Sequence, residues 1–160
     1  MGSIRIDDGT KEYKIENNYG KEICRIHFRP ADLALMDRFE NISATLGDVL
    51  EPLKEIGLMT DGTPEDQTAQ GWETLKKAEA EVIRKFNELF DTDDLGEAFK
   101  TRSAFSSIGG KFFCEVLLDA IGGVIAEEFA KEAEATRARI EKYLPTAEEQ
   151  TDAGAAADNG

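Results

Sequence analysis

The chain has few of the residues that build catalytic and metal sites, with two cysteines and one histidine among 160 residues. Cys24 and Cys114 lie far apart, which is no disulfide framework and is typical of a reducing compartment. His27 and Cys24 fall on opposite faces of a predicted strand, so they do not form a base–nucleophile pair. The three residues also lack the spacing of a zinc site. We therefore expect no catalytic residues, no metal ligands, no cofactor and no enzyme activity.

Long hydrophobic runs are also missing. The most apolar stretch, residues 112–126, is shorter than the roughly 20 residues of a membrane-spanning helix and contains Glu115 and Asp119. The first residues of the chain include no apolar segment of the kind found in signal peptides. These absences predict a soluble, cytoplasmic protein that does not enter a membrane.

Positive charge is scarce, since 19 basic residues face 33 acidic ones and the net charge is −14. Such an excess opposes binding to nucleic acid and to anionic lipid, so neither is expected as a partner. Residues 1–30 have six basic and five acidic residues, whereas residues 31–144 have 13 and 24. Residues 145–160 have four acidic residues, no basic residue and no large apolar side chain, which predicts a disordered acidic tail.

Residues 1–30 have the apolar–polar alternation of half-buried β-strands. Residues 4–6 and 13–15 alternate in this way, and Asp8-Gly9 between them is a turn signal. A third strand is predicted over residues 22–28. The result is a small three-stranded antiparallel β-meander, which needs helices to cover its apolar face.

From residue 31 the apolar positions recur every three or four residues, which predicts a helical body over residues 31–144. Asp32 is the predicted N-cap of the first helix. A break is expected between Gly47 and Pro52, because proline costs about 3 kcal/mol inside a helix. The predicted fold is therefore α+β and mostly α, with the meander packed on a bundle of three to five helices.

A second long helix is predicted to open at Thr63-Pro64 and to end near Phe90. Short helical pieces are expected over residues 94–108, followed by a last helix over residues 111–143. Gly122-Gly123 lies inside this last helix, where each glycine costs about 1 kcal/mol relative to alanine. The pair therefore indicates either a kink or a site of close helix packing.

Two groups of acidic residues are candidates for a chemical role. Residues 91–96 resemble the start of a calcium loop, but Leu95 and Arg102 occupy the positions where oxygen ligands are required. These acids are instead predicted to cap the next helix. Glu115 and Asp119 form a like-charge pair at i, i+4, and no role is assigned to them.

One group of apolar residues is the predicted partner-binding site. Phe105, Ile108, Phe112 and Phe113 flank the flexible Gly109-Gly110 pair. An apolar groove of this kind can hold a helical apolar segment of another protein. The alternative is that all four side chains belong to the core of the chain itself.

The order of these elements resembles a known family. The strand at residues 22–28 is followed by the junction Phe28-Arg29-Pro30-Ala31-Asp32, a helix with Asp37-Arg38-Phe39, acidic helices and an acidic tail. This arrangement over residues 4–144 is similar to small tail assembly chaperones of long-tailed bacteriophages and prophages of Gram-positive bacteria.

The resemblance implies a non-enzymatic role in viral tail assembly. Such chaperones keep the long helical tape-measure protein soluble, recruit subunits of the major tail-tube protein, and are absent from the mature virion. It also implies a homo-oligomer in the host bacterial cytoplasm and, in many members, a longer form made by ribosomal frameshifting. The alternative function is a non-enzymatic structural or adaptor component of a phage tail or of another assembly.

Overall fold

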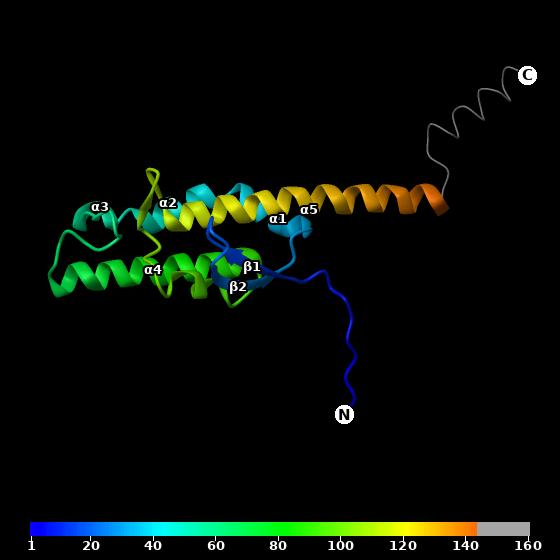
Figure 1. Ribbon diagram of the computed structural model, residues 1–160, viewed down its shortest axis with the longest axis horizontal. Coiled ribbons are helices and arrows are strands. Elements are labelled where there is room, and N and C mark those ends of the chain that lie inside the picture. Colours follow the sequence, from blue (N-terminus) through cyan, green and yellow to red (C-terminus); the bar gives the residue numbers. More distant parts are fainter. Residues whose placement is uncertain (144–160) are drawn as a thin grey trace, which may run out of the picture.

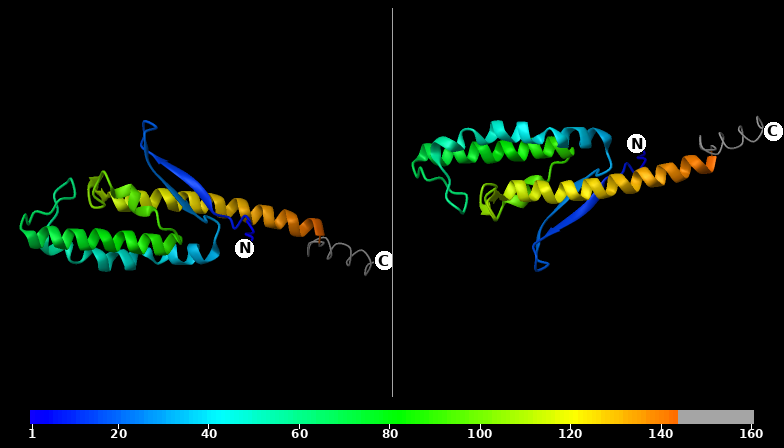
Figure 2. Two further views of the ribbon diagram at one scale, coloured as in Figure 1. Left: turned by 90° about the horizontal axis from the view of Figure 1, so that it is seen from below. Right: turned by 90° about the horizontal axis from the view of Figure 1, so that it is seen from above.

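The computed structural model describes residues 1–143, except for the side chains at positions 43, 44 and 143. The predicted acidic tail at residues 145–160 lies outside the described residues. The molecule is long and narrow, with two long helices side by side and a β-hairpin that crosses one of them (Figures 1 and 2). The prediction of a mostly helical chain with a small antiparallel β-structure at its N-terminal end is confirmed.

The N-terminal β-structure is a hairpin of β1 (Lys11–Glu16) and β2 (Glu22–Phe28). The Asn17 side chain accepts hydrogen bonds from the backbone N–H groups of Tyr19 and Lys21, which closes the turn. Alternate residues of the hairpin face the helices, and the others face solvent except for the half-buried Ile23. The inward-facing side chains are Tyr13, Ile15, Cys24, Ile26 and Phe28.

The predicted strand at residues 4–6 is wrong for the single chain, because the N-terminal sheet has two strands, β1 and β2, in the described residues. The carboxylates of Asp7 and Asp8 accept hydrogen bonds from the N–H groups of Gly9 and Thr10. These local bonds turn the chain away from β1, and residues 1–10 leave the hairpin as an exposed arm (Figure 1). The three-stranded meander is therefore a two-stranded hairpin.

Three short helices follow: α1 (Leu33–Glu40), α2 (Ile42–Leu50) and α3 (Leu53–Ile56). The Asp32 side chain accepts a hydrogen bond from the Ala34 N–H, which confirms the predicted N-cap. The expected break between Gly47 and Pro52 is confirmed at the boundary of α2 and α3. The break at Asn41 was not predicted; there the Asn41 amide donates to the Asp37 carbonyl oxygen.

The second long helix, α4 (Ala69–Phe90), begins later than the sequence suggests. Thr63-Pro64 lies instead in a loop, where Pro64 pairs with Leu58 in an isolated β-bridge. Thr68 is the N-cap, and its hydroxyl accepts a hydrogen bond from the Gly71 N–H. The predicted end near Phe90 is confirmed.

Beyond α4 lie the short 3₁₀ helix η1 (Leu95–Phe99) and a second hairpin of β3 (Ser107–Ile108) and β4 (Lys111–Phe112). Gly109 and Gly110 both have positive φ angles, 59° and 86°, as a two-residue hairpin turn requires. The last helix, α5 (Phe113–Tyr143), therefore begins two residues after its predicted start. The Glu115 carboxylate accepts a hydrogen bond from the Phe112 N–H and so satisfies a donor at this end.

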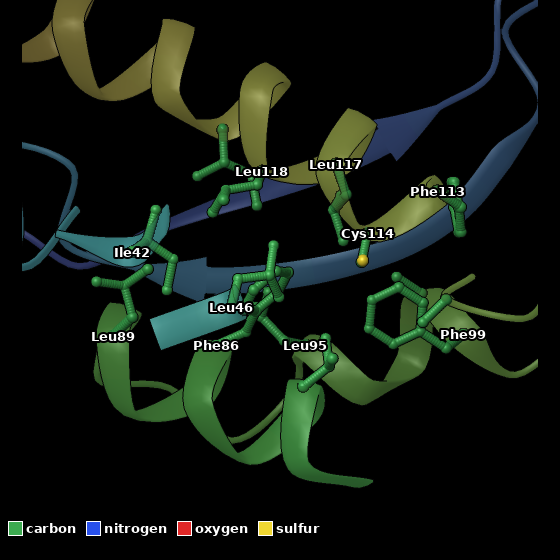
Figure 3. Close-up of a cluster of buried hydrophobic side chains, with 14 of the residues drawn as sticks. Ile42, Leu46, Phe86, Leu89, Leu95, Phe99, Phe113, Cys114, Leu117 and Leu118 are labelled. Atoms are coloured by element: carbon green, nitrogen blue, oxygen red, sulfur yellow. The ribbon is translucent and has the colours of Figure 1, made fainter. Parts of the chain in front are cut away.

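The core lies between α2, α4, η1 and the first half of α5 (Figure 3). Burying one such leucine or phenylalanine side chain contributes about 1.5–3 kcal/mol. Figure 3 shows side chains from these elements pointing toward one another: Ile42, Leu46, Phe86, Leu89, Leu95, Phe99, Phe113, Leu117 and Leu118. This packing fixes the position of the first half of α5 and leaves its second half outside.

Gly122 is a close-packing site. A Cβ atom built on Gly122 would lie 2.5 Å from Cζ of Phe39 in α1, whereas one on Gly123 would meet nothing within 4 Å. Of the two alternatives that the sequence left open, close packing therefore describes Gly122, and α5 runs as one helix through both glycines.

Candidate partner-binding surface

The four apolar residues predicted to bind a partner lie together around the β3–β4 hairpin. Phe105 and Phe113 are 1% and 7% exposed, while Ile108 and Phe112 are half-buried. The rings of Phe105 and Phe112 meet edge to face with centroids 5.7 Å apart, and Phe113 meets Phe99 in the same way at 5.8 Å. Two of the four are therefore core residues of this chain. Binding of a partner at this place stays a prediction, and Ile108 and Phe112 are the members that a partner can reach.

The lone histidine ties the N-terminal hairpin to η1. His27 contacts Asp94 through its Nδ1 atom at 2.9 Å and Glu12 through its Nε2 atom at 3.0 Å. The hydrogen bond with Asp94 is the main cause that raises the pKa of His27 above its ordinary 6.5, and Glu12 adds to it. His27 is exposed on the outer face of β2, whereas Cys24 is buried on the inner face, as predicted.

The sequence missed this link because it assigned the acids after α4 to helix capping. Asp94 precedes η1 but makes no side-chain capping bond. Its carboxylate instead accepts hydrogen bonds from the Thr92 hydroxyl and from the backbone N–H of His27. The other cysteine, Cys114, is fully buried, and burial raises its thiol pKa to about 12, which keeps the thiol neutral and unreactive.

No group of three or more histidine, cysteine, aspartate or glutamate side chains is placed to hold a metal ion within residues 1–143. The acidic pair in α5 has separate partners: Glu115 bonds the Phe112 N–H, and Asp119 forms an ion pair of 2.8 Å with Lys111. Over the same range, no helix is long and apolar enough to cross a membrane.

The second half of α5 projects beyond the rest of the molecule (Figures 1 and 2). We call residues 126–142 the projection. Its base is held by Lys11, whose ammonium group lies 2.7 Å from the Glu128 carboxylate and lowers the pKa of that carboxyl group. Residues 130–142 are all exposed, so no other part of residues 1–143 covers them.

The two large apolar side chains described in the projection, Phe129 and Ile140, lie on one face of α5. Phe129, Ala133, Thr136 and Ile140 follow one another at intervals of four, three and four residues, the spacing of a coiled-coil seam. We call these four residues the α5 stripe. Phe129 is half-buried at the base, while Ile140 is 52% exposed near the far end. The other positions include five glutamates and four basic residues between 127 and 142.

A hollow of about 630 Å³ lies at the base of the projection. It is bounded by the arm, by the start of α1 and by Glu128 and Glu132 of α5. Leu33 lines it and is 65% exposed. The hollow adjoins the α5 stripe, because Glu128 and Glu132 flank Phe129 on the helix.

The sequence predicted that the last helix runs through residue 143 but assigned no role to the residues after Ala126. The available signal was the change in composition after Ala126, where large apolar residues become sparse but keep a helical spacing. That signal does not say whether a stripe is covered by the same chain, and only the position of α5 in the fold answers the question.

Comparison of the chain with protein-family models, with curated proteins and with solved structures gave no match.

Proposed function

We propose that this protein is a phage tail assembly chaperone that binds the tape-measure protein along the projection of α5 and recruits tail-tube subunits to it. The observation that carries the proposal is the α5 stripe, which is exposed from Ala133 onward on a helix that extends past its own core. The resemblance of the N-terminal strands, the Phe28–Asp32 junction and the acidic helices supplies the identity of the client.

A helical client suits this surface physically. The exposed end of the projection, residues 130–142, is 13 residues long, a length at which an isolated helix is marginal in water, so it gains stability when a second helix packs on it. The stripe offers Phe129, Ala133 and Ile140 as contacts, and the flanking charges limit which helices fit. The acidic body, with 24 acidic against 13 basic residues over 31–144, keeps an apolar client from aggregating.

The test is co-expression with the tape-measure protein encoded in the same tail gene cluster. Wild-type chain is expected to hold the tape-measure protein in the soluble fraction and to co-purify with it. The double variant Ala133→Glu/Ile140→Glu places two carboxylates in the stripe and is expected to lose co-purification at least about tenfold, the effect of 1.4 kcal/mol. Both positions are exposed, so the thermal melting curve should not change.

Ala135→Glu/Ala138→Glu is the matched control, because both alanines are exposed on the opposite face of the same helix and the added charge is equal. If both double variants bind the client equally, the stripe is not the client surface. If the wild-type chain binds no tape-measure protein, or is found in purified virions, the alternative of a structural or adaptor component is favoured instead.

A further inference from the structure

The outer edge of β1 is open. The backbone N–H of His27 donates a hydrogen bond to the Asp94 side chain, so it points away from β1. Glu12 and His27, which face each other across the hairpin, are therefore a pair without backbone hydrogen bonds between them. Because this pattern alternates, the backbone groups of Glu12 and Lys14 point to the outer edge of β1. Within residues 1–143 no other strand pairs with that edge.

The arm carries a strand pattern that the single chain does not use. Ile4 and Ile6 flank Arg5 and are 92% and 79% exposed, so the alternating side chains have nothing to pack against in residues 1–143. In an extended segment the two isoleucines lie on the same side. They can therefore pack together on one face of a sheet if residues 4–6 join it as a strand.

We propose that residues 4–6 of one copy add as a strand to the outer edge of β1 in a second copy, and that the two copies exchange arms. In the antiparallel register that places Arg5 opposite Glu12, Ile4 lies opposite Tyr13 on the inner face of the hairpin. Arg5 then meets an acidic side chain, whereas the register shifted by two residues places it opposite Lys14. The predicted three-stranded sheet thus forms between chains.

The connection is long enough for this exchange. In a continuous sheet made of both hairpins and both arms, the partner's arm lies between β1 and the arm of the same chain. β1 is then two strand spacings, about 10 Å, away from its own arm. The four residues between Ile6 and Lys11 span on the order of 15 Å when extended. The region also suits self-association of an acidic chain, because residues 1–30 have a net charge of only +1.

The first experiment measures self-association of the full chain by sedimentation velocity at increasing concentration. Wild-type chain is expected to form a dimer, and Ile4→Asp/Ile6→Asp is expected to weaken it at least about tenfold. The matched control is Tyr19→Asp/Met59→Asp, which adds the same charge at two other exposed apolar residues and should dimerise like the wild type. A monomeric wild type, or equal dimerisation of both variants, would overturn the proposal.

The second experiment places the arm directly. Arg5→Cys/Glu12→Cys is expected to form a disulfide-linked dimer on mild oxidation, since facing strand residues lie about 5.5 Å apart between Cα atoms. Arg5→Cys/Lys14→Cys, shifted by two residues, should cross-link much less. The buried native cysteines do not interfere. A cross-link within one chain would show that the arm folds back on its own β1, and equal dimer cross-linking of both variants would show no fixed register; either result overturns the proposal.

Discussion

At the scale of single residues, Gly122 and Gly123 show how one neighbour decides what a glycine contributes. Both lie inside α5, and both lower its helix propensity by about 1 kcal/mol relative to alanine. Only Gly122 lies under the ring of Phe39, which also packs against Phe90 at a centroid distance of 6.5 Å. The cost in helix propensity is therefore offset by close packing at Gly122, whereas no contact offsets it at Gly123.

Alanine at these two positions gives opposite expected results. Gly123→Ala should raise the free energy of unfolding by about 0.5–1 kcal/mol, because it gains helix propensity without a clash. Gly122→Ala should be about 1–3 kcal/mol less stable than Gly123→Ala, because the Phe39 ring must move. Urea denaturation of the two variants checks this. Adding Phe39→Leu should recover part of the loss in Gly122→Ala only, and equal stabilities would contradict the packing role.

At the scale of elements, the sequence was most informative where a local signal decides the structure. The extent of β2, the cap at Asp32, the break before α3 and the end of α4 follow from alternation, a capping side chain, a proline and a loss of periodicity. Each of these signals acts within a few residues, so tertiary contacts had little to change.

Two wrong predictions, the start of α4 and the strand at residues 4–6, have a different cause, which is competition between two local signals. Thr63-Pro64 and Thr68 are both good helix starts, and pairing of Pro64 with Leu58 leaves Thr68 as the cap. Residues 4–6 alternate like a strand, but Asp7 and Asp8 turn the chain before it can pair. The burial of Phe105 and the exposure of the α5 stripe depend on tertiary packing, which the spacing of apolar residues along the sequence does not predict.

The contact between β2 and η1 is expected to depend on pH through His27. Its pKa is raised in the folded chain, so its stabilising charge interaction is complete below the unfolded pKa of about 6.5 and is lost as pH rises through the folded pKa. The neutral ring then keeps one donor for two carboxylates. The stability advantage of the wild type over His27→Gln should therefore be larger at about pH 6 than at about pH 8.5.

Urea denaturation of both proteins at the two pH values measures this difference. Asp94→Asn provides a second comparison, because it removes the carboxylate that contributes most to the raised pKa of His27. In that background, replacing His27 should change the pH dependence much less. An advantage that is the same at both pH values would show that the contact is independent of the charge on His27.

At the scale of the whole molecule, the chain consists of a packed body and a projection joined by one continuous helix. Ile121 and Ile125 of α5 are buried in the body, while residues 130–142 are exposed throughout. The charge follows a different division, with the acidic excess on residues 31–144 and near balance over residues 1–30. One molecule therefore presents two surfaces of different character, a helical stripe on α5 and a strand edge on β1, which our two proposals assign to a client and to a second copy.

This division predicts two levels of stability along α5, which amide hydrogen exchange measures residue by residue. In dilute free chain, amides of residues 130–142 should exchange faster than those of residues 117–125 by about two orders of magnitude or more, because they open without unfolding the body. Adding the tape-measure protein should slow exchange in the projection. Ala133→Glu/Ile140→Glu should abolish that added protection, whereas Ala135→Glu/Ala138→Glu should retain it. Equal protection of both halves in dilute free chain would contradict the uncovered projection, and protection that grows with chain concentration alone would assign the α5 stripe to self-association rather than to the client.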